Sequence, residues 1–295
     1  MSLPPLPTTA FPTVLANVHS HASELFEKDG LMSFLTNSTL VALCVLGLVL
    51  WFARKATKKM TLVPHKAQNF MEFVVEFLYG QVEAIAGAKQ AKLAFPLLCT
   101  LFIYILVSNW FGLLPGVGTI GWGESTGFLS VKAAHDPLLR PPTADLNATI
   151  GIALSAFLVW LFLTIKEVGV WGFIVHTFGP KGGLKGIMGL VVAAVFLFVG
   201  VIEIVSIVIR PVTLSIRLFG NIFAGENVLH IMSDMMSGKH PVMSFLGSVV
   251  LPLPFYFMEL LVGLLQAIVF TLLCTVYIQL STTHDDHGHE EEGHH

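Results

Sequence analysis

Long apolar runs separated by short polar segments dominate the pattern of this chain. A helix needs about 20 mostly apolar residues to cross a hydrocarbon layer about 30 Å thick, and five runs approach or exceed this length. The predicted spanning helices cover residues 35–52, 93–114, 146–165, 187–236 and 242–280. They lie in a predicted membrane domain of residues 34–283, which follows an external N-terminal segment of residues 1–33. The pattern therefore predicts an all-α integral membrane protein.

One further stretch, residues 67–86, has apolar residues at helical spacing among amide and carboxylate side chains. Such a helix has one apolar and one polar face, which suits a position at the membrane surface better than a position across it. The sequence therefore predicts one amphipathic interfacial helix, on the cytoplasmic face, in addition to the five spans.

The last two apolar runs are longer than a bilayer requires. Continuous helices over 187–236 and 242–280 would be on the order of 75 Å and 60 Å long, at about 1.5 Å per residue. Helices of that length must tilt steeply, kink or emerge, and Pro211, Gly220 and Gly225 are places where the first could bend. We expect a steeply tilted, antiparallel hairpin of two overlong helices.

Composition and charge agree with a lipid environment. The chain is 54% hydrophobic and 12% charged, with a mean hydropathy of +0.77. The five spans place ten of the 16 Lys and Arg residues on one side of the membrane, four on the other and two within it. Because basic residues are enriched in cytoplasmic loops, we expect the N-terminus outside and the C-terminus in the cytoplasm.

Charged side chains inside the fourth run are the candidate chemistry, because a central Arg costs about 3 kcal/mol on insertion scales. Such a charge indicates either a functional site or a paired interior charge. Glu203, Arg210 and Arg217 follow one another at seven-residue intervals. This spacing rotates each by only about 20° from the last, so they share one helix face, with Asn221 close to it. Glu226 is about half a turn out of phase with Arg217, so the two charges should face different surroundings.

The fifth run supplies two further polar residues, Glu259 and Gln266, again seven residues apart and on one face. In an antiparallel hairpin, Glu259 would approach Glu226 and Gln266 would approach Arg217. One helix face would then hold a fixed positive charge, and another would hold carboxylates that can load and release protons. This is the arrangement that an ion relay needs.

The segment 210–226, RPVTLSIRLFGNIFAGE, resembles the signature of the a subunit of F-type ATP synthases, the stator half of a rotary ion channel. The likeness extends over most of the chain. Further matching segments are SNWFGLLP at 108–115, PPTADLN at 141–147 and QAIVF at 266–270.

The resemblance implies roles for the intramembrane polar residues. It makes Arg217 the essential stator arginine. The implied proton path consists of Asn221, Glu226, Glu259, Gln266 and Glu203. Glu259 stands where some members have histidine, so the external half-channel would hold two carboxylates, which usually titrate as a coupled pair.

The resemblance also implies partners and a mechanism. The partners are a ring of c-type proteolipid subunits, b-type peripheral stalk subunits and, indirectly, the soluble catalytic sector, in a bacterial inner membrane. Burial keeps a ring carboxylate neutral in lipid, and the carboxylate ionises opposite Arg217. A guanidinium is effectively never deprotonated, so Arg217 would block direct proton flow between the two half-channels.

Several alternatives stay open on the residues alone. Arg210, next to Pro211, is interpreted as a side chain that snorkels to the interface rather than a catalytic group. Glu203 either belongs to the relay or pairs with Arg210. The tail, residues 284–295, is expected to be disordered, with metal binding by its His and acidic residues as the alternative.

Two other functions compete with the stator. A self-contained proton channel or secondary transporter would need intramembrane charge as well, but the chain shows no internal repeat. A structural scaffold would not need such charge. The sequence contains no nucleotide-binding P-loop, so the chain is not expected to be an enzyme in itself. We expect no cofactor, no metal and no nucleic-acid partner.

Overall fold

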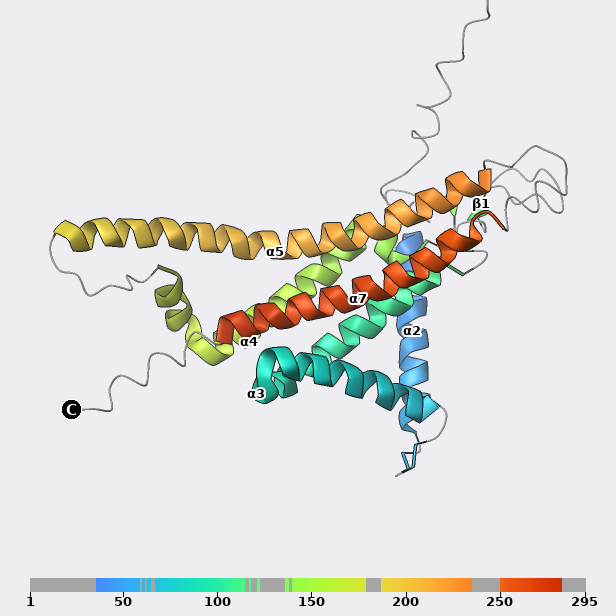
Figure 1. The fold of residues 1–295 in the computed structure, drawn as a ribbon, viewed down its shortest axis with the longest axis horizontal. Helices are drawn as coiled ribbons and strands as arrows, with labels where there is room; N and C mark the ends of the chain where they lie inside the picture. The colour runs from blue at the N-terminus through green and yellow to red at the C-terminus, as the bar shows by residue number, and fades with distance from the viewer. Residues whose placement is uncertain are drawn as a thin grey trace, which may run out of the picture.

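The computed structural model describes residues 36–58, 60–61, 63–64, 67–114, 117, 121–122, 136–137, 140–178, 187–234 and 250–282. Nearly all of them are helical (Figure 1). The long helices are α2 (Asn37–Thr57), α3 (Ala67–Gly112), α4 (Leu146–Phe178), α5 (Ile187–Asp234) and α7 (Leu253–Thr282). Each contains a stretch long and apolar enough to cross a membrane. The predicted all-α membrane class with five spanning helices is confirmed. The predicted N-terminal segment and tail lie outside the described residues.

Three short elements, two strands and a 3-10 turn, lie between α3 and α4. The strand β1 (Gly121–Trp122) pairs antiparallel with β2 (Asp136–Pro137). A single 3-10 turn, η1 (Pro142–Ala144), leads into α4.

The helix α3 contains both the predicted interfacial helix and the second predicted span. The two halves meet at Gly87, whose φ of 79° and ψ of 160° lie in a region that residues with a Cβ rarely adopt. The helix α4 turns in the same way at Gly169, with φ 78° and ψ 157°, and continues to Phe178. The predicted span ended at residue 165, so the structure adds a helical segment after it. Glycine therefore makes both sharp turns between membrane-crossing and flanking helix.

The helices α5 and α7 run antiparallel, as predicted for the hairpin (Figure 1). With 48 residues, α5 is about 72 Å long. Gly87 and Gly169 are the positive-φ glycines of the described chain, so α5 passes Pro211, Gly220 and Gly225 without a left-handed break. Figure 1 shows α5 as a gentle arc that lies across the direction of α2. The excess length of α5 is therefore not taken up by a sharp kink.

The start of α7 corrects the predicted span of 242–280. Residues 250–252 form a turn, and the helix begins only at Leu253. The backbone N–H of Tyr256 donates to the carbonyl of Pro252 at 2.9 Å, which closes the first helical turn. Pro254 sits within this turn, where a missing N–H leaves no helical bond unmade. Residues 242–249 lie outside the described part.

The segment around η1 ties α2 to α4 through buried polar contacts. The hydroxyl of Ser38 on α2 donates to the Asp145 carboxylate at 2.7 Å. The other oxygen of Asp145 accepts from the backbone N–H of Asn147 at 3.1 Å, as an N-cap does at the start of a helix. On the next turn of α4, Thr149 accepts from the Ser215 hydroxyl on α5 at 3.2 Å. These contacts hold the start of α4 against the middle of α5.

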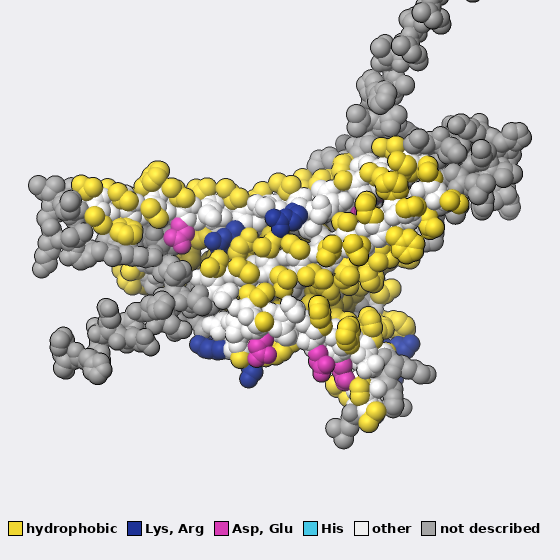
Figure 2. Space-filling view, viewed as in Figure 1, with side chains coloured by type: hydrophobic (Ala, Val, Ile, Leu, Met, Phe, Trp, Pro, Cys, Tyr) yellow, Lys and Arg dark blue, Asp and Glu magenta, His cyan; other side chains and the backbone are white. Residues whose placement is uncertain are grey.

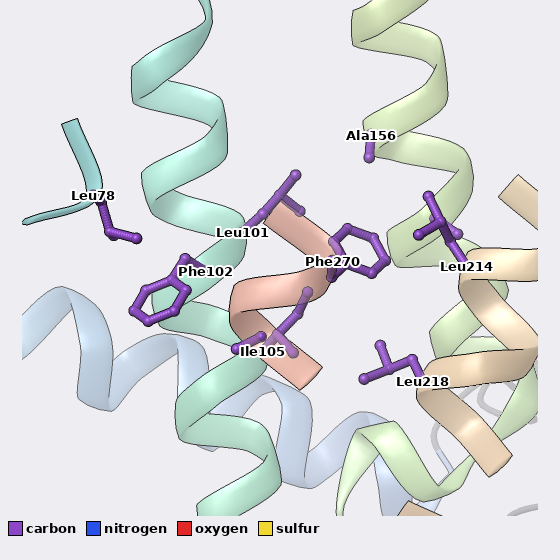
Figure 3. Packing of buried hydrophobic residues seen from close by; sticks show 10 residues of the cluster. Leu78, Leu101, Phe102, Ile105, Ala156, Leu214, Leu218 and Phe270 are labelled. Carbon is purple, nitrogen blue, oxygen red and sulfur yellow. The ribbon is translucent and has the colours of Figure 1, made fainter. Parts of the chain in front are cut away.

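The core lies where α3, α4, α5 and α7 meet. Phe270 of α7 is fully buried at its centre. In Figure 3 its ring points toward Leu214 of α5, with Leu101 of α3 close by. The other labelled members of the cluster are Leu78, Phe102, Ile105, Ala156 and Leu218.

We expect Phe270→Ala to lower the unfolding free energy of the protein in detergent by about 3 kcal/mol, the low end for Phe-to-Ala changes in soluble cores. In lipid or detergent the variant still loses the packing contacts of the Phe270 ring. The free energy of transferring an apolar side chain from lipid into the core is small, so it adds little. Thermal unfolding checks this. Phe257→Ala is the matched control, because Phe257 lies on the same helix and is 70% exposed. Equal melting temperatures for the two variants would contradict this core assignment.

Candidate functional site

Arg217 lies on an exposed edge of α5. Leu214 and Leu218 on either side of it are 5% and 0% exposed and belong to the core. Ile216 points the other way and is 57% exposed. Figure 2 shows acidic and basic side chains in a row along α5, on a surface that is otherwise largely apolar. Among the described residues, no carboxylate forms an ion pair with Arg217. Within the described part of the chain, the guanidinium is therefore an exposed charge and not a paired interior charge.

The contact between α5 and α7 next to Arg217 is a hydrogen bond between two amides. The Asn221 Nδ2 donates to the Gln266 Oε1 at 2.8 Å. Asn221 is one helical turn beyond Arg217, and Gln266 is 4% exposed. The predicted register brought Gln266 toward Arg217, and the structure pairs it with Asn221, one helical turn beyond Arg217. The Nε2 of Gln266 is buried and has no hydrogen-bond partner in the described part of the chain.

Glu259 lies two turns earlier on α7 and is 5% exposed. Its carboxylate packs against Gly225 of α5, so closely that a Cβ at position 225 would collide with it. The half-buried Glu226 is the next residue of α5, so the predicted approach of Glu259 to this part of the hairpin is observed. The Oε1 of Glu259 is also buried, and no described residue hydrogen-bonds to it.

Sequence reasoning missed a third contributor, the pair Ser108 and Asn109 on α3. Both are buried, at 0% and 2% exposure. The Asn109 Nδ2 donates at 3.1 Å to the carbonyl of Gly263, which lies between Glu259 and Gln266 on α7. The Ser108 Oγ and the Asn109 Oδ1 lack a partner among the described residues. The sequence signal that could have identified them is the presence of two adjacent polar residues inside an apolar run.

These residues form a polar column between α3, α5 and α7, which we define as Ser108, Asn109, Asn221, Gly225, Glu259, Gln266 and the adjacent Glu226. Buried polar atoms in proteins are normally hydrogen-bonded, and those without a protein partner usually meet water. The column therefore contains buried polar atoms that can hydrogen-bond to water. It ends beside Arg217.

Arg210 packs against two aromatic rings that come from other helices. Its guanidinium carbon lies 4.8 Å from the ring centre of Tyr277 on α7 and 5.9 Å from that of Trp160 on α4. The side chain is half-buried. Glu203 is also half-buried and forms no ion pair with Arg210. Of the two interpretations of Glu203, a role in the relay or pairing with Arg210, the pairing is therefore not observed.

Known proteins resemble most of this chain. Residues 35–279 match the family described as ATP synthase A chain. The chain is 35% identical over 242 residues to the ATP synthase subunit a of Pseudomonas savastanoi pv. phaseolicola, which covers 81% of this chain and 79% of that protein. It is 34% identical over 245 residues to that of Protochlamydia amoebophila, covering 81% and 78%. It is 31% identical over 272 residues to that of Shewanella loihica, covering 92% and 95%. The likeness extends from α2 to α7.

Proposed function

The chain belongs to the ATP synthase A chain family, and from this membership we propose that it is the proton-conducting stator of the membrane sector of a rotary ATP synthase. In this role it provides two offset half-channels and a fixed arginine that faces a rotating ring of c-type subunits. The observation that carries the proposal is Arg217, an exposed guanidinium without an ion pair among the described residues, placed where a buried polar column ends.

The surface around Arg217 favours a helical partner. Ser206, Thr213 and Gly220 follow one another at seven-residue spacing on the side of α5 that carries Arg217. Small residues let two membrane helices approach closely, because little side chain separates their backbones. Ile209 and Ile216, which flank this side, are 52% and 57% exposed. A ring helix that packs here would bring its carboxylate within reach of the guanidinium.

The extent of the polar column supports a half-channel rather than a continuous pore. Beyond Gln266, the hydroxyls of Thr271 and Thr275 donate to carbonyls of their own helix at 2.9 Å, so both are satisfied. Phe270 fills the core at this level. A self-contained channel or transporter would need its polar path to continue through this region. The geometry therefore favours the stator over that alternative.

In the proposed cycle, protons enter the column from the external side through Glu226 and Glu259 and reach a ring carboxylate near Asn221 and Gln266. The ring carries the neutral carboxylate through lipid, where burial disfavours its charged form. On the other side, toward Glu203, it releases the proton to the cytoplasm. Arg217 stabilises the ionised carboxylate between the two paths and cannot relay a proton itself. Each proton contributes about 2.3 kcal/mol per 100 mV of membrane potential.

The remaining parts of the proposal concern the setting of the chain. The N-terminus lies outside and the C-terminus in the cytoplasm of a bacterial inner membrane, as the distribution of basic residues favours. The b-type peripheral stalk subunits hold the chain against the torque of the ring and connect it to the soluble catalytic sector. Nucleotide chemistry belongs to that sector.

Cysteine crosslinking to the ring tests the proposed interface. A cysteine at Ser206, which is exposed on the Arg217 side of α5, is expected to form a disulfide with a cysteine on the outer helix of a c-type subunit. Leu214 is the matched control, because it lies on the same helix but is 5% exposed and faces the core. Equal yields from the two positions, or no adduct from Ser206→Cys, would argue against this face as the ring contact.

A further inference from the structure

Arg210 joins three helices through aromatic rings. Its guanidinium belongs to α5, while the two rings that it contacts, Trp160 and Tyr277, come from α4 and α7. The rings are themselves connected, because the Trp160 indole N–H donates to the Tyr277 backbone carbonyl at 2.9 Å. The ring of Phe157 packs against the ring of Trp160, with 5.3 Å between ring centres. We call Arg210, Trp160 and Tyr277 the aromatic clamp.

The clamp acts at a weak point of α5. Pro211 has no backbone N–H, so the helix lacks one hydrogen bond there, to the carbonyl four residues earlier. A cavity with mostly apolar walls lies beside the clamp and is lined by residues that include Leu97, Leu214 and Pro211. A cavity leaves the apolar side chains around it less closely packed, so their contacts restrain rotation of α5 less there than close packing would. A cation held over two rings does restrain rotation, because it is attracted to the ring faces alone.

The clamp lies close to Arg217 along a continuous helix. The two arginines are seven residues apart, which corresponds to a rise of about 10 Å and a rotation of only about 20°. The intervening residues are helical, so a rotation of α5 at Arg210 reaches Arg217 almost unchanged. Arg210 nevertheless packs into the bundle while Arg217 remains exposed.

We infer that Arg210 is a positioning residue, whose aromatic clamp fixes the rotation of α5 so that Arg217 faces the ring. This inference rests on the proposed stator function. Arg210 itself neither contacts the ring carboxylate nor transfers a proton. Loss of the clamp leaves α5 in place but lets Arg217 swing away from the ring carboxylate, which lowers the fraction of productive encounters.

The test is a double-mutant cycle on ATP-driven proton pumping, measured per assembled complex in vesicles. Tyr277→Leu is expected to lower the rate about fivefold, in keeping with the loss of one cation–ring contact, and Arg210→Leu, which loses both ring contacts, is expected to lower it at least as much. The double variant is expected to be no slower than Arg210→Leu alone, since the contact that Tyr277→Leu breaks is already lost in that variant. Arg210→Lys keeps a cation over the rings and is expected to restore most of the rate. Trp171→Leu, at a 77% exposed aromatic of α4, is the control.

A second readout separates positioning from a merely structural role. In Arg210→Leu, the disulfide yield from Ser206→Cys to the ring should fall while yields rise at neighbouring positions of α5, which reports a rotated helix. If Arg210→Leu does not assemble, Arg210→Gln is measured in its place and is expected to show the same loss. Wild-type pumping per complex, multiplicative losses in the double variant, or an unchanged crosslinking pattern would overturn the inference. Wild-type pumping by Arg217→Ala would instead overturn the stator function itself.

Discussion

Arg217→Ala is expected to abolish ATP-driven proton pumping in vesicles that contain the assembled complex. The guanidinium is the exposed charge at the end of the polar column, and a fixed charge of this kind stabilises the ionised ring carboxylate. Removing one preorganised electrostatic group from a site commonly costs a rate factor of about a hundred or more. Because alanine would no longer separate the two proposed half-channels, passive proton leak should rise while coupled pumping falls.

The matched control for this change is Arg54→Ala, which removes a guanidinium from the exposed end of α2. It should leave pumping unchanged. Arg217→Lys keeps the charge but loses the planar, delocalised group, and lysine can also deprotonate, so this variant should remain strongly impaired. Coupled pumping by Arg217→Ala near the wild-type rate would rule out the proposed role.

Gly225→Ala is expected to produce the second-largest loss, about tenfold or more in pumping, although it adds only a methyl group. The Cβ would collide with the Glu259 carboxylate, which is confined between α5 and α7. Overpacking a tight site costs about 1–3 kcal/mol, and here the displaced group belongs to the proposed proton path.

Gly151→Ala on α4 is the control for Gly225→Ala, because nothing lies within 4 Å of the position that its Cβ would take. Both changes raise helix propensity equally, so propensity does not explain a difference between them. The initial rate of pumping per assembled complex is the measurement. Rates that agree between the two variants would mean that the position of Glu259 does not matter for transport.

The features predicted from sequence are those that one helix determines by itself. The apolar runs are long enough to define the spanning helices, and the seven-residue spacing of Glu203, Arg210 and Arg217 fixes their shared face. The approach of Glu259 to the Gly225–Glu226 segment followed from antiparallel pairing of two continuous helices. These inferences require only the helical repeat and the antiparallel direction of the two helices.

The features missed depend on contacts between helices that are distant in sequence. Asn109 meets Gly263 across 154 residues, and Trp160 meets Tyr277 across 117. No periodicity along one helix contains that information, so the α3 residues of the polar column and the aromatic clamp emerged only from the structure. The aromatic partners of Arg210 were not predicted for the same reason, because they lie on other helices.

The turn at Gly87 in α3 lies in the gap between the predicted interfacial helix, 67–86, and the predicted span, 93–114. The kink at Gly169 in α4 was missed for a different reason. A single glycine next to an apolar run is compatible with a straight helix and with a sharp turn, and only the backbone angles distinguish the two. Gly169 adopts positive φ, while Gly151 and Gly220 lie in regular helix, and the flanking sequence does not separate these cases.

The most direct test of the central claim is potential-driven proton flux through the membrane sector, with the ring carboxylate replaced by a neutral residue. If this chain conducts protons only by passing them to the ring, flux should fall to that of empty vesicles, although Arg217 and the polar column are intact. Flux that persists at the unmodified rate would show that the chain carries a complete channel of its own and would contradict the account.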